Sequence, residues 1–295
     1  MKRKGKIPGR YHKTLKEQVR ENPRLAAVYV ILRVLVVLAL VAQVFNGNFE
    51  NVFLCVLTLI LFTIPSFIER TIRIDIPDTL EIIILLFIFA AEILGEIQAY
   101  YVQFPYWDTM LHTLNGFLCA AIGFSLVDLF NRNERFSLSL SPVFMAIVAF
   151  CFSMTIGVLW EFFECIMDSF FLLDMQKDTI VHDISTVMLD PTGGNKITAI
   201  RGITDVIVVA GGKEIPLGLG GYLDIGLLDT MKDLFVNFIG AVVFSFIGYF
   251  YVKSRGKGRF ARRFIPQVVD IQPEDQEPWT PKLLKKSKKN RSDKE

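Results

Sequence analysis

The sequence predicts an all-α membrane protein with six transmembrane helices. Hydrophobic residues make up 52% of the 295 positions, 26 of them are Phe, and the mean hydropathy is +0.42, which is too apolar for an ordinary soluble domain. Six apolar stretches reach the roughly 20 residues that cross the hydrocarbon core of a bilayer. They cover 25–45, 50–68, 80–101, 108–130, 141–165 and 230–252.

The charged residues are concentrated at the two ends of the chain. Residues 1–24 carry nine Lys or Arg against two Glu, and residues 253–295 carry thirteen Lys or Arg against six acids. We expect residues 1–24 to be a basic N-terminal segment and residues 253–295 a disordered basic tail. Because both adjoin predicted spans, their expected partners are anionic membrane lipids and not nucleic acid.

The basic residues between the spans predict the orientation. Arg70 and Arg73 lie between the second and third stretches, and Arg132 and Arg135 lie between the fourth and fifth. Positive loops favour the cytoplasmic side, so both termini are expected in the cytoplasm. The protein itself is expected in the cell membrane. Spans one to five then occupy 25–168 and the sixth 229–252.

The connection 169–228 is expected outside the cell, as a domain of its own. It contains the β-branched runs KITAIRG and TDVIVVAGGKEIPLG, and the Gly pair in the second run is typical of the turn in a β-hairpin. We therefore expect a small β-hairpin domain, whose role as a lid or as a partner-binding surface stays open.

Acidic residues gather at the predicted outer ends of four spans. The third span contributes two Glu, the fifth two Glu and one Asp, and the fourth and sixth each begin with Asp and continue with a polar residue at helical spacing. The residues concerned are Glu92, Glu96, Asp108, His112, Asn115, Glu161, Glu164, Asp168, Asp229, Asp233 and Asn237.

Two of the spans share a short motif. WDTMLH at 107–112 and LDTMKD at 228–233 each open an apolar stretch with Asp-Thr-Met. This predicts a two-fold repeat of helix pairs, spans three and four against spans five and six, about an axis along the membrane normal.

A structural reading competes with a functional one at each acid. Asp108 and Asp229 stand where helix N-caps belong, and capping is the favoured reading for these two. Glu92, Glu161 and Asp233 lie deeper, where an ionised carboxylate without a partner costs a few kcal/mol. For these three we favour a function.

Carboxylates with one imidazole suit a divalent cation, and Mg, Mn, Ca and Zn all stay open. The expected ligands are Asp108, His112, Glu161, Glu164 and Asp233. Glu92 or Glu96 is the expected general base toward water. Asn115, Asp168 and Asn237 complete the polar site, and Asp229 is expected to cap its helix.

The stretches WDTMLHTLNGFLCAAIGF, WEFFE and DTMKDLFVNFIGA resemble the YjdF-like bacterial integral membrane proteins and, distantly, the VanZ-like family. The resemblance covers about 25–252. It implies the multi-pass architecture and, because the YjdF-like family has no established activity, no mechanism. The long 169–228 connection and the basic tail depart from the family pattern.

Three functions stay open at this point. The leading hypothesis is a metal-dependent enzyme acting on a lipid or lipid-linked substrate at the outer leaflet. The alternatives are a cation- or proton-coupled transporter and a non-catalytic scaffold or sensor that uses the 169–228 loop. The substrate, the metal and the oligomeric state, including a homo-oligomer, are not determined by the sequence.

Overall fold

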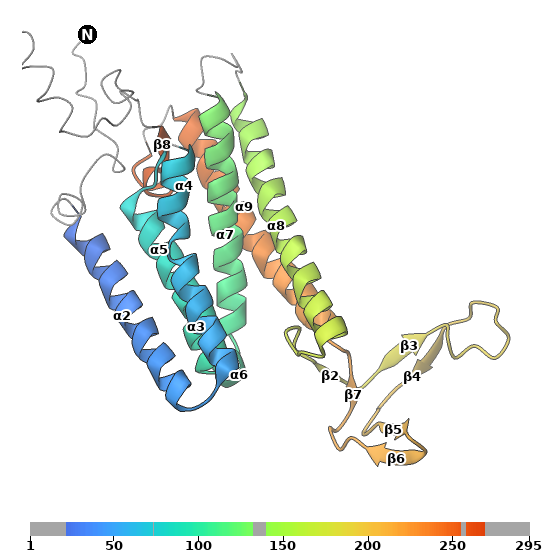
Figure 1. Ribbon diagram of the computed structural model, residues 1–295. Helices are drawn as coiled ribbons and strands as arrows, with labels where there is room; N and C mark the ends of the chain where they lie inside the picture. Colours follow the sequence, from blue (N-terminus) through green and yellow to red (C-terminus); the bar gives the residue numbers. More distant parts are fainter. Residues whose placement is uncertain (1–21, 73, 132–139, 255–257, 269–295) are drawn as a thin grey trace, which may run out of the picture. The chain divides into compact units, whose positions relative to one another are not determined.

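A computed structural model describes residues 22–72, 74–131, 140–254 and 258–268. The expectations for the N-terminal segment up to residue 21, for the tail from 269 onward and for the loop arginines at 73, 132 and 135 lie outside these residues. The chain forms two compact units, one from residues 1–89 with 262–295 and the other from residues 90–261. Both are mainly helical, and Figure 1 labels their elements.

Among the described residues, five helices are long and apolar enough to cross a membrane, by length and composition. This agrees with the multi-pass architecture expected from the sequence. The five candidate spans are Pro23–Phe45, Phe49–Glu69, Trp107–Asn131, Pro142–Phe171 and Leu227–Lys253.

The first unit contains α2 (Pro23–Phe45), α3 (Phe49–Leu61), α4 (Ile64–Ile72) and α5 (Asp78–Phe89), of which α2, α3 and α5 pack against one another. Pro23 starts α2, where its missing N–H costs no helical hydrogen bond. Strand β1 (Ile74–Asp75) pairs antiparallel with β8 (Gln267–Val268). Within this unit the Tyr29 hydroxyl donates to Glu81 Oε1 over 2.7 Å, so a buried acid on α5 is satisfied from α2.

The expected third span at 80–101 is not one continuous α-helix. Helix α5 ends at Phe89, and the chain continues as the π-helix η2 (Ala90–Ile97) and then the short helix α6 (Tyr100–Gln103). Ala99 adopts a left-handed conformation with φ of 55°, which stops the helix before α6. The stretch is therefore not among the five candidate spans, because its backbone changes its hydrogen-bonding pattern near Glu92 and Glu96.

The second unit is built on α7 (Trp107–Asn131), α8 (Pro142–Phe171) and α9 (Leu227–Lys253), which pack against one another (Figure 1). Helices α7 and α9 approach closely at two glycines. A Cβ on Gly116 would lie 2.1 Å from the Asn237 carbonyl oxygen, and one on Gly240 would lie 2.1 Å from the Thr113 carbonyl oxygen. Small residues at such crossings let backbones touch, as is common between membrane helices.

The segment between α8 and α9 carries three short antiparallel strand pairs. Strand β2 (Ile180–Val181) pairs with β7 (Tyr222–Leu223), and β3 (Ile184–Thr186) pairs with β4 (Thr198–Ile200). Strands β5 (Ile207–Ala210) and β6 (Lys213–Pro216) form a hairpin. Gly211 and Gly212 make its turn with φ of +58° and +76°, a conformation that favours glycine.

Asp190 organises the loop between β3 and β4. Its carboxylate accepts hydrogen bonds from the backbone N–H and hydroxyl of Thr192 and from the backbone N–H of Lys196. These donors, the Lys196 N–H first, lower the pKa of Asp190 to about 2, because they stabilise its ionised form.

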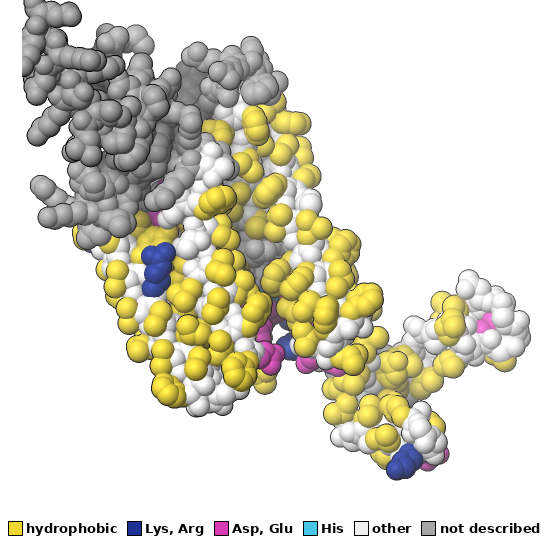
Figure 2. Space-filling model, in the orientation of Figure 1, with side chains coloured by type: hydrophobic (Ala, Val, Ile, Leu, Met, Phe, Trp, Pro, Cys, Tyr) yellow, Lys and Arg dark blue, Asp and Glu magenta, His cyan; other side chains and the backbone are white. Residues whose placement is uncertain are grey.

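The helical surface is hydrophobic along its sides. Figure 2 shows hydrophobic side chains over the long faces of the described helices, with acidic side chains gathered at the end from which the β-strand segment leaves. Large apolar residues on α8 and α9, such as Phe170 at 79% and Phe235 at 62% exposure, are uncovered by protein. Such a surface is suited to contact with lipid.

Candidate carboxylate–histidine site

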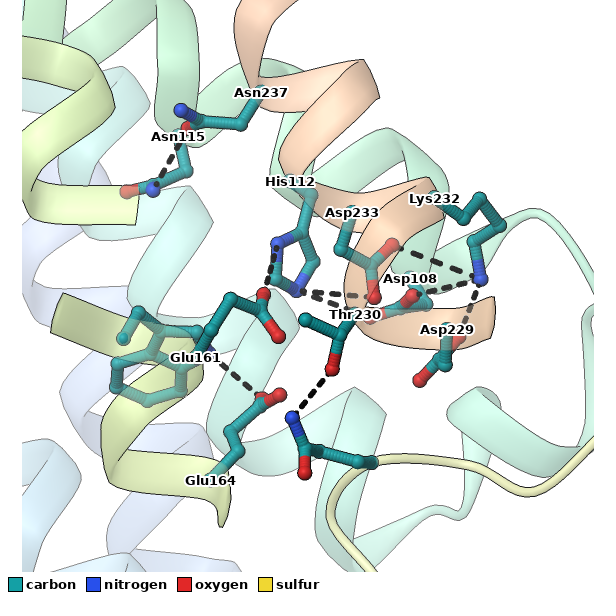
Figure 3. Close-up of polar contacts among 12 residues, drawn as sticks. Asp108, His112, Asn115, Glu161, Glu164, Asp229, Thr230, Lys232, Asp233 and Asn237 are labelled. Carbon is teal, nitrogen blue, oxygen red and sulfur yellow. Dashed lines mark hydrogen bonds and ion pairs between the residues drawn. The ribbon is translucent and has the colours of Figure 1, made fainter. Parts of the chain in front are cut away.

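The acidic end of the second unit contains a cluster that draws on three helices. Helix α7 supplies Asp108 and His112 one turn apart, α8 supplies Glu161, and α9 supplies Asp233 (Figure 3). Helices α7 and α9 both begin at this end and α8 ends there. For this reason the two Asp-containing helix starts and the Glu-containing helix end meet.

The imidazole of His112 lies between the carboxylates. Its Nε2 is 3.4 Å from Asp108 Oδ1 and 4.0 Å from Asp233 Oδ2, and its Nδ1 is 3.8 Å from Glu161 Oε1. One ligand atom from each of Asp108, His112 and Asp233 lies within 4.8 Å of the others. The two ring nitrogens thus face different acids, the Asp pair on one side and Glu161 on the other.

These polar groups are withdrawn from the surface. The side chain of Asp233 is 2% exposed, that of Glu161 5% and that of His112 12%. Within the described residues, Asp108 Oδ2, Glu161 Oε2 and Asp233 Oδ1 are buried and have no hydrogen-bond partner. A buried carboxylate oxygen without an electropositive neighbour is costly, and for Asp108 Oδ2 and Asp233 Oδ1 the ammonium of Lys232 is such a neighbour, at 3.4 Å and 3.6 Å.

Lys232 is the cation next to these acids. Its Nζ lies 2.6 Å from Asp229 Oδ1, 3.4 Å from Asp108 Oδ2 and 3.6 Å from Asp233 Oδ1. Its side chain is 44% exposed, whereas that of Asp229 is 10% exposed. The ammonium therefore stands at the open edge of the cluster, and Asp229 is the closest of the three aspartates to it.

Glu164 lies beside Glu161 on α8. Trp160 donates its indole N–H to Glu164 Oε1 over 2.7 Å, which holds that carboxylate in place. Opposite it, the Gln176 side chain donates to the Thr230 hydroxyl. Gln176 belongs to the segment that follows α8, so this segment reaches the edge of the site (Figure 3).

A polar pair continues the site into the helix interface. Asn115 donates to Asn237 Oδ1 over 3.3 Å, and Asn237 donates to the sulfur of Met154. Asn237 is 1% exposed. Both residues were expected in the site. Asn115 lies three residues after His112 on α7, and Asn237 lies four residues after Asp233 on α9.

Asp229 and Asp168, two of the residues predicted around the site, accept hydrogen bonds from the loop backbone. The N-cap of α9 is Gly226, so the prediction that Asp229 caps this helix is wrong; the carboxylate of Asp224 accepts from the backbone N–H of Gly226 and Leu228. Asp229 lies inside the first turn and accepts from the Lys177 backbone N–H at 2.9 Å. Asp168 accepts from the backbone N–H groups of Met175 and Gln176 and so folds the chain back after α8.

The remaining expectations concern Asp108, Glu92 and Glu96. Asp108 is the second residue of α7, and its Oδ1 lies 3.4 Å from His112 Nε2; its role as a helix cap stays a prediction. Glu92 and Glu96 lie on η2, and the group of ligand atoms within 4.8 Å does not include them. Their role as general base stays a prediction.

Gln176 and Thr230 were not among the residues predicted for the site, whereas Lys232 stands among the predicted acids in the sequence. The sequence indicates a partner for Lys232, since this residue stands three positions after Asp229 at a helix start, where i,i+3 ion pairs form. No such indication exists for Gln176 and Thr230, because 54 residues separate them in the chain.

The fold and the cluster together define a multi-pass membrane protein with a buried carboxylate–histidine site. The chain matches the model of one family, described as predicted membrane protein (DUF2238), over residues 27–254. It therefore belongs to this family, which is the family of YjdF. The comparison lends no support to the distant VanZ-like resemblance. No curated protein and no solved structure matches the chain.

Proposed function

We propose that the cluster binds a divalent cation and that the protein is a metal-dependent enzyme acting on a lipid or lipid-linked substrate. The observation that carries the proposal is the convergence of Asp108, His112 and Asp233, whose ligand atoms lie within 4.8 Å of one another. Two carboxylates and one imidazole are a donor set that Zn, Mn or Mg accepts. Glu161 Oε2, a buried carboxylate oxygen without a hydrogen bond, lies beside this set and supports a further cation there.

Glu161 has the position of a group that orients His112. Metal-binding histidines commonly direct the second ring nitrogen to a carboxylate, which fixes the tautomer. Here Nε2 faces Asp108 and Asp233, and Nδ1 faces Glu161 Oε1 at 3.8 Å. Glu161 Oε2 then remains as an acceptor for a proton, so the proposal transfers the general-base role to Glu161 from Glu92 or Glu96.

The surroundings of the cluster support a substrate that arrives from the membrane. On α8, Phe170 and Phe171 follow the acids in the chain and are 79% and 64% exposed. On α9, Leu228 and Met231 flank Asp229 at 46% and 56% exposure. Because uncovered apolar residues extend beyond the acids on both helices, the cluster lies within the band that lipid would contact.

The packing of α7 against α9 beyond the cluster favours an enzyme over a carrier. Past Asn115 and Asn237, the backbones of α7 and α9 touch at Gly116 and Gly240. The rings of Phe124 and Phe244, both fully buried, then fill the interface with centroids 6.1 Å apart. Along this interface of the described helices, the asparagine pair is thus followed by touching backbones and packed aromatic rings, whereas a carrier needs a route to the other side.

The metal is tested by elemental analysis and by calorimetric titration of the detergent-purified protein with MnCl₂. We expect one divalent ion per chain in the wild type, and loss of binding by tenfold or more in His112→Ala and Asp233→Asn, as expected when one of about three ligands is removed. Asp168→Asn is the matched control, because that carboxylate accepts from the loop backbone and lies outside the ligand group.

The absence of stoichiometric metal in the wild type, even after supplementation, would refute the metal site. The lipid substrate is tested separately, by mass spectrometry of lipids from cells that express the wild type or Asp233→Asn at equal levels. We expect at least one lipid species to be depleted or formed only with the wild type. Identical lipid profiles together with normal metal binding would reject the enzyme and leave a metal-binding scaffold.

A further inference from the structure

Lys232 contacts the same carboxylates that the proposed metal would use. Its ammonium is 3.4 Å from Asp108 Oδ2 and 3.6 Å from Asp233 Oδ1, while its shortest ion pair, 2.6 Å, is with Asp229. Asp229 is outside the group of three ligands. The ammonium of Lys232 therefore already compensates part of the negative charge of Asp108 and Asp233, and the Asp229 carboxylate is a further partner for it.

We infer that Lys232 is a tethered counter-ion that a divalent cation displaces, and that it makes the site selective for divalent over monovalent cations. This inference rests on the proposed metal site. A monovalent ion brings no more charge to Asp108 and Asp233 than the ammonium already supplies. A divalent ion brings twice the charge, so only it gains enough Coulomb energy to replace the ammonium.

The position of Lys232 allows this exchange. Its side chain is 44% exposed, and its flexible four-carbon stem lets the ammonium move toward solvent. After leaving Asp108 and Asp233 it keeps its contact with Asp229, the partner to which it is already closest. The ammonium therefore does not lose every partner when the metal enters, and the acids are never left without a cation.

The alternative is a purely structural ion pair that holds the starts of α7 and α9 together. Both roles predict that loss of the ammonium lowers stability. They differ in metal binding, because a structural pair predicts equal or weaker affinity, whereas a displaced counter-ion predicts tighter binding once the competitor is removed.

The test is calorimetric titration of the full-length, detergent-purified protein with MnCl₂, with KCl added at constant ionic strength. We expect Lys232→Met to bind Mn²⁺ about tenfold more tightly than the wild type or tighter, and KCl to weaken this binding only in the variant. Lys232→Arg should restore discrimination against K⁺. Lys177→Met is the matched control, because its ammonium pairs with Asp174 and not with the cluster.

Each other result overturns the inference. Equal Mn²⁺ affinity in the wild type and Lys232→Met would leave the metal site standing and make Lys232 structural. Tighter binding that KCl does not weaken would remove the selectivity. No Mn²⁺ binding in either protein would overturn both the inference and the proposed function. Lys232→Gln, which retains a polar side chain, replaces the Met variant if that variant does not fold.

Discussion

We expect a substitution at the crossing of α7 and α9 to lower both the stability of the fold and metal binding at the site. Gly240→Ala would place a Cβ 2.1 Å from the Thr113 carbonyl oxygen and 2.8 Å from the Phe117 nitrogen. Both neighbours are backbone atoms of α7, which cannot rotate away. Since real Cβ contacts are essentially never shorter than 3.0 Å, the atoms must separate along that line by 3.0 − 2.1 = 0.9 Å.

This displacement should have two effects. Overpacking of this kind costs about 1–3 kcal/mol of unfolding free energy. The move of α9 away from α7 also carries Asp233 away from His112, whose Nε2 is already 4.0 Å from Asp233 Oδ2. We therefore expect lower stability in SDS-driven equilibrium unfolding and weaker Mn²⁺ binding in the same variant.

The matched control is Gly258→Ala, where an added Cβ would meet its nearest neighbour, Tyr251, at an ordinary 3.6 Å. We expect it to change neither the unfolding free energy nor the affinity for Mn²⁺. If Gly240→Ala unfolds and binds metal like the wild type, the close approach of the two helices does not position the site, and the reasoning is refuted.

Three further predictions follow from the contacts described. Tyr29→Phe removes the hydrogen bond to buried Glu81 and should lower the unfolding free energy by about 1 kcal/mol; an unchanged value would show that other contacts of Glu81 compensate. Asp190 should titrate by NMR near pH 2. Because its pKa is lowered in the folded state, the stabilisation of the loop is present above the unfolded pKa of about 4 and is lost as the pH falls through 2. A normal pKa would contradict the loop geometry. EDTA should lower the thermal unfolding midpoint of the wild type but not of His112→Ala, and an equal effect on both would count against the metal site.

The hydrophobic architecture followed from composition and length alone. Twenty apolar residues in a row have few alternatives to a membrane helix, because only intrahelical hydrogen bonds satisfy the backbone in lipid. The expected boundaries of the span at 108–130 differ from those of α7 by one residue at each end. In the 80–101 stretch, apolar composition did not reveal the change from α5 to a π-helix, since hydrophobic side chains predominate in both segments.

The candidate site was only partly accessible to sequence reasoning. Spacing along each helix identified Asp108 with His112 and Asp233 with Asn237, because residues three or four apart share a helical face. It also grouped Glu92 and Glu96 with them, although the 4.8 Å ligand group does not include these two. Equal depth in the membrane does not bring side chains on different helices into contact.

The sequence by itself determined that this chain crosses a membrane several times and carries acids at a cost that requires partners. Both properties arise from local features, hydrophobic length and helical period, which do not depend on how helices pack. The tertiary structure alone decided which acids share a cation, that Asp229 holds the loop through the Lys177 backbone instead of capping α9, and that α7 and α9 touch. These depend on contacts between residues up to 127 positions apart, as for Thr113 and Gly240, and helix packing sets such contacts.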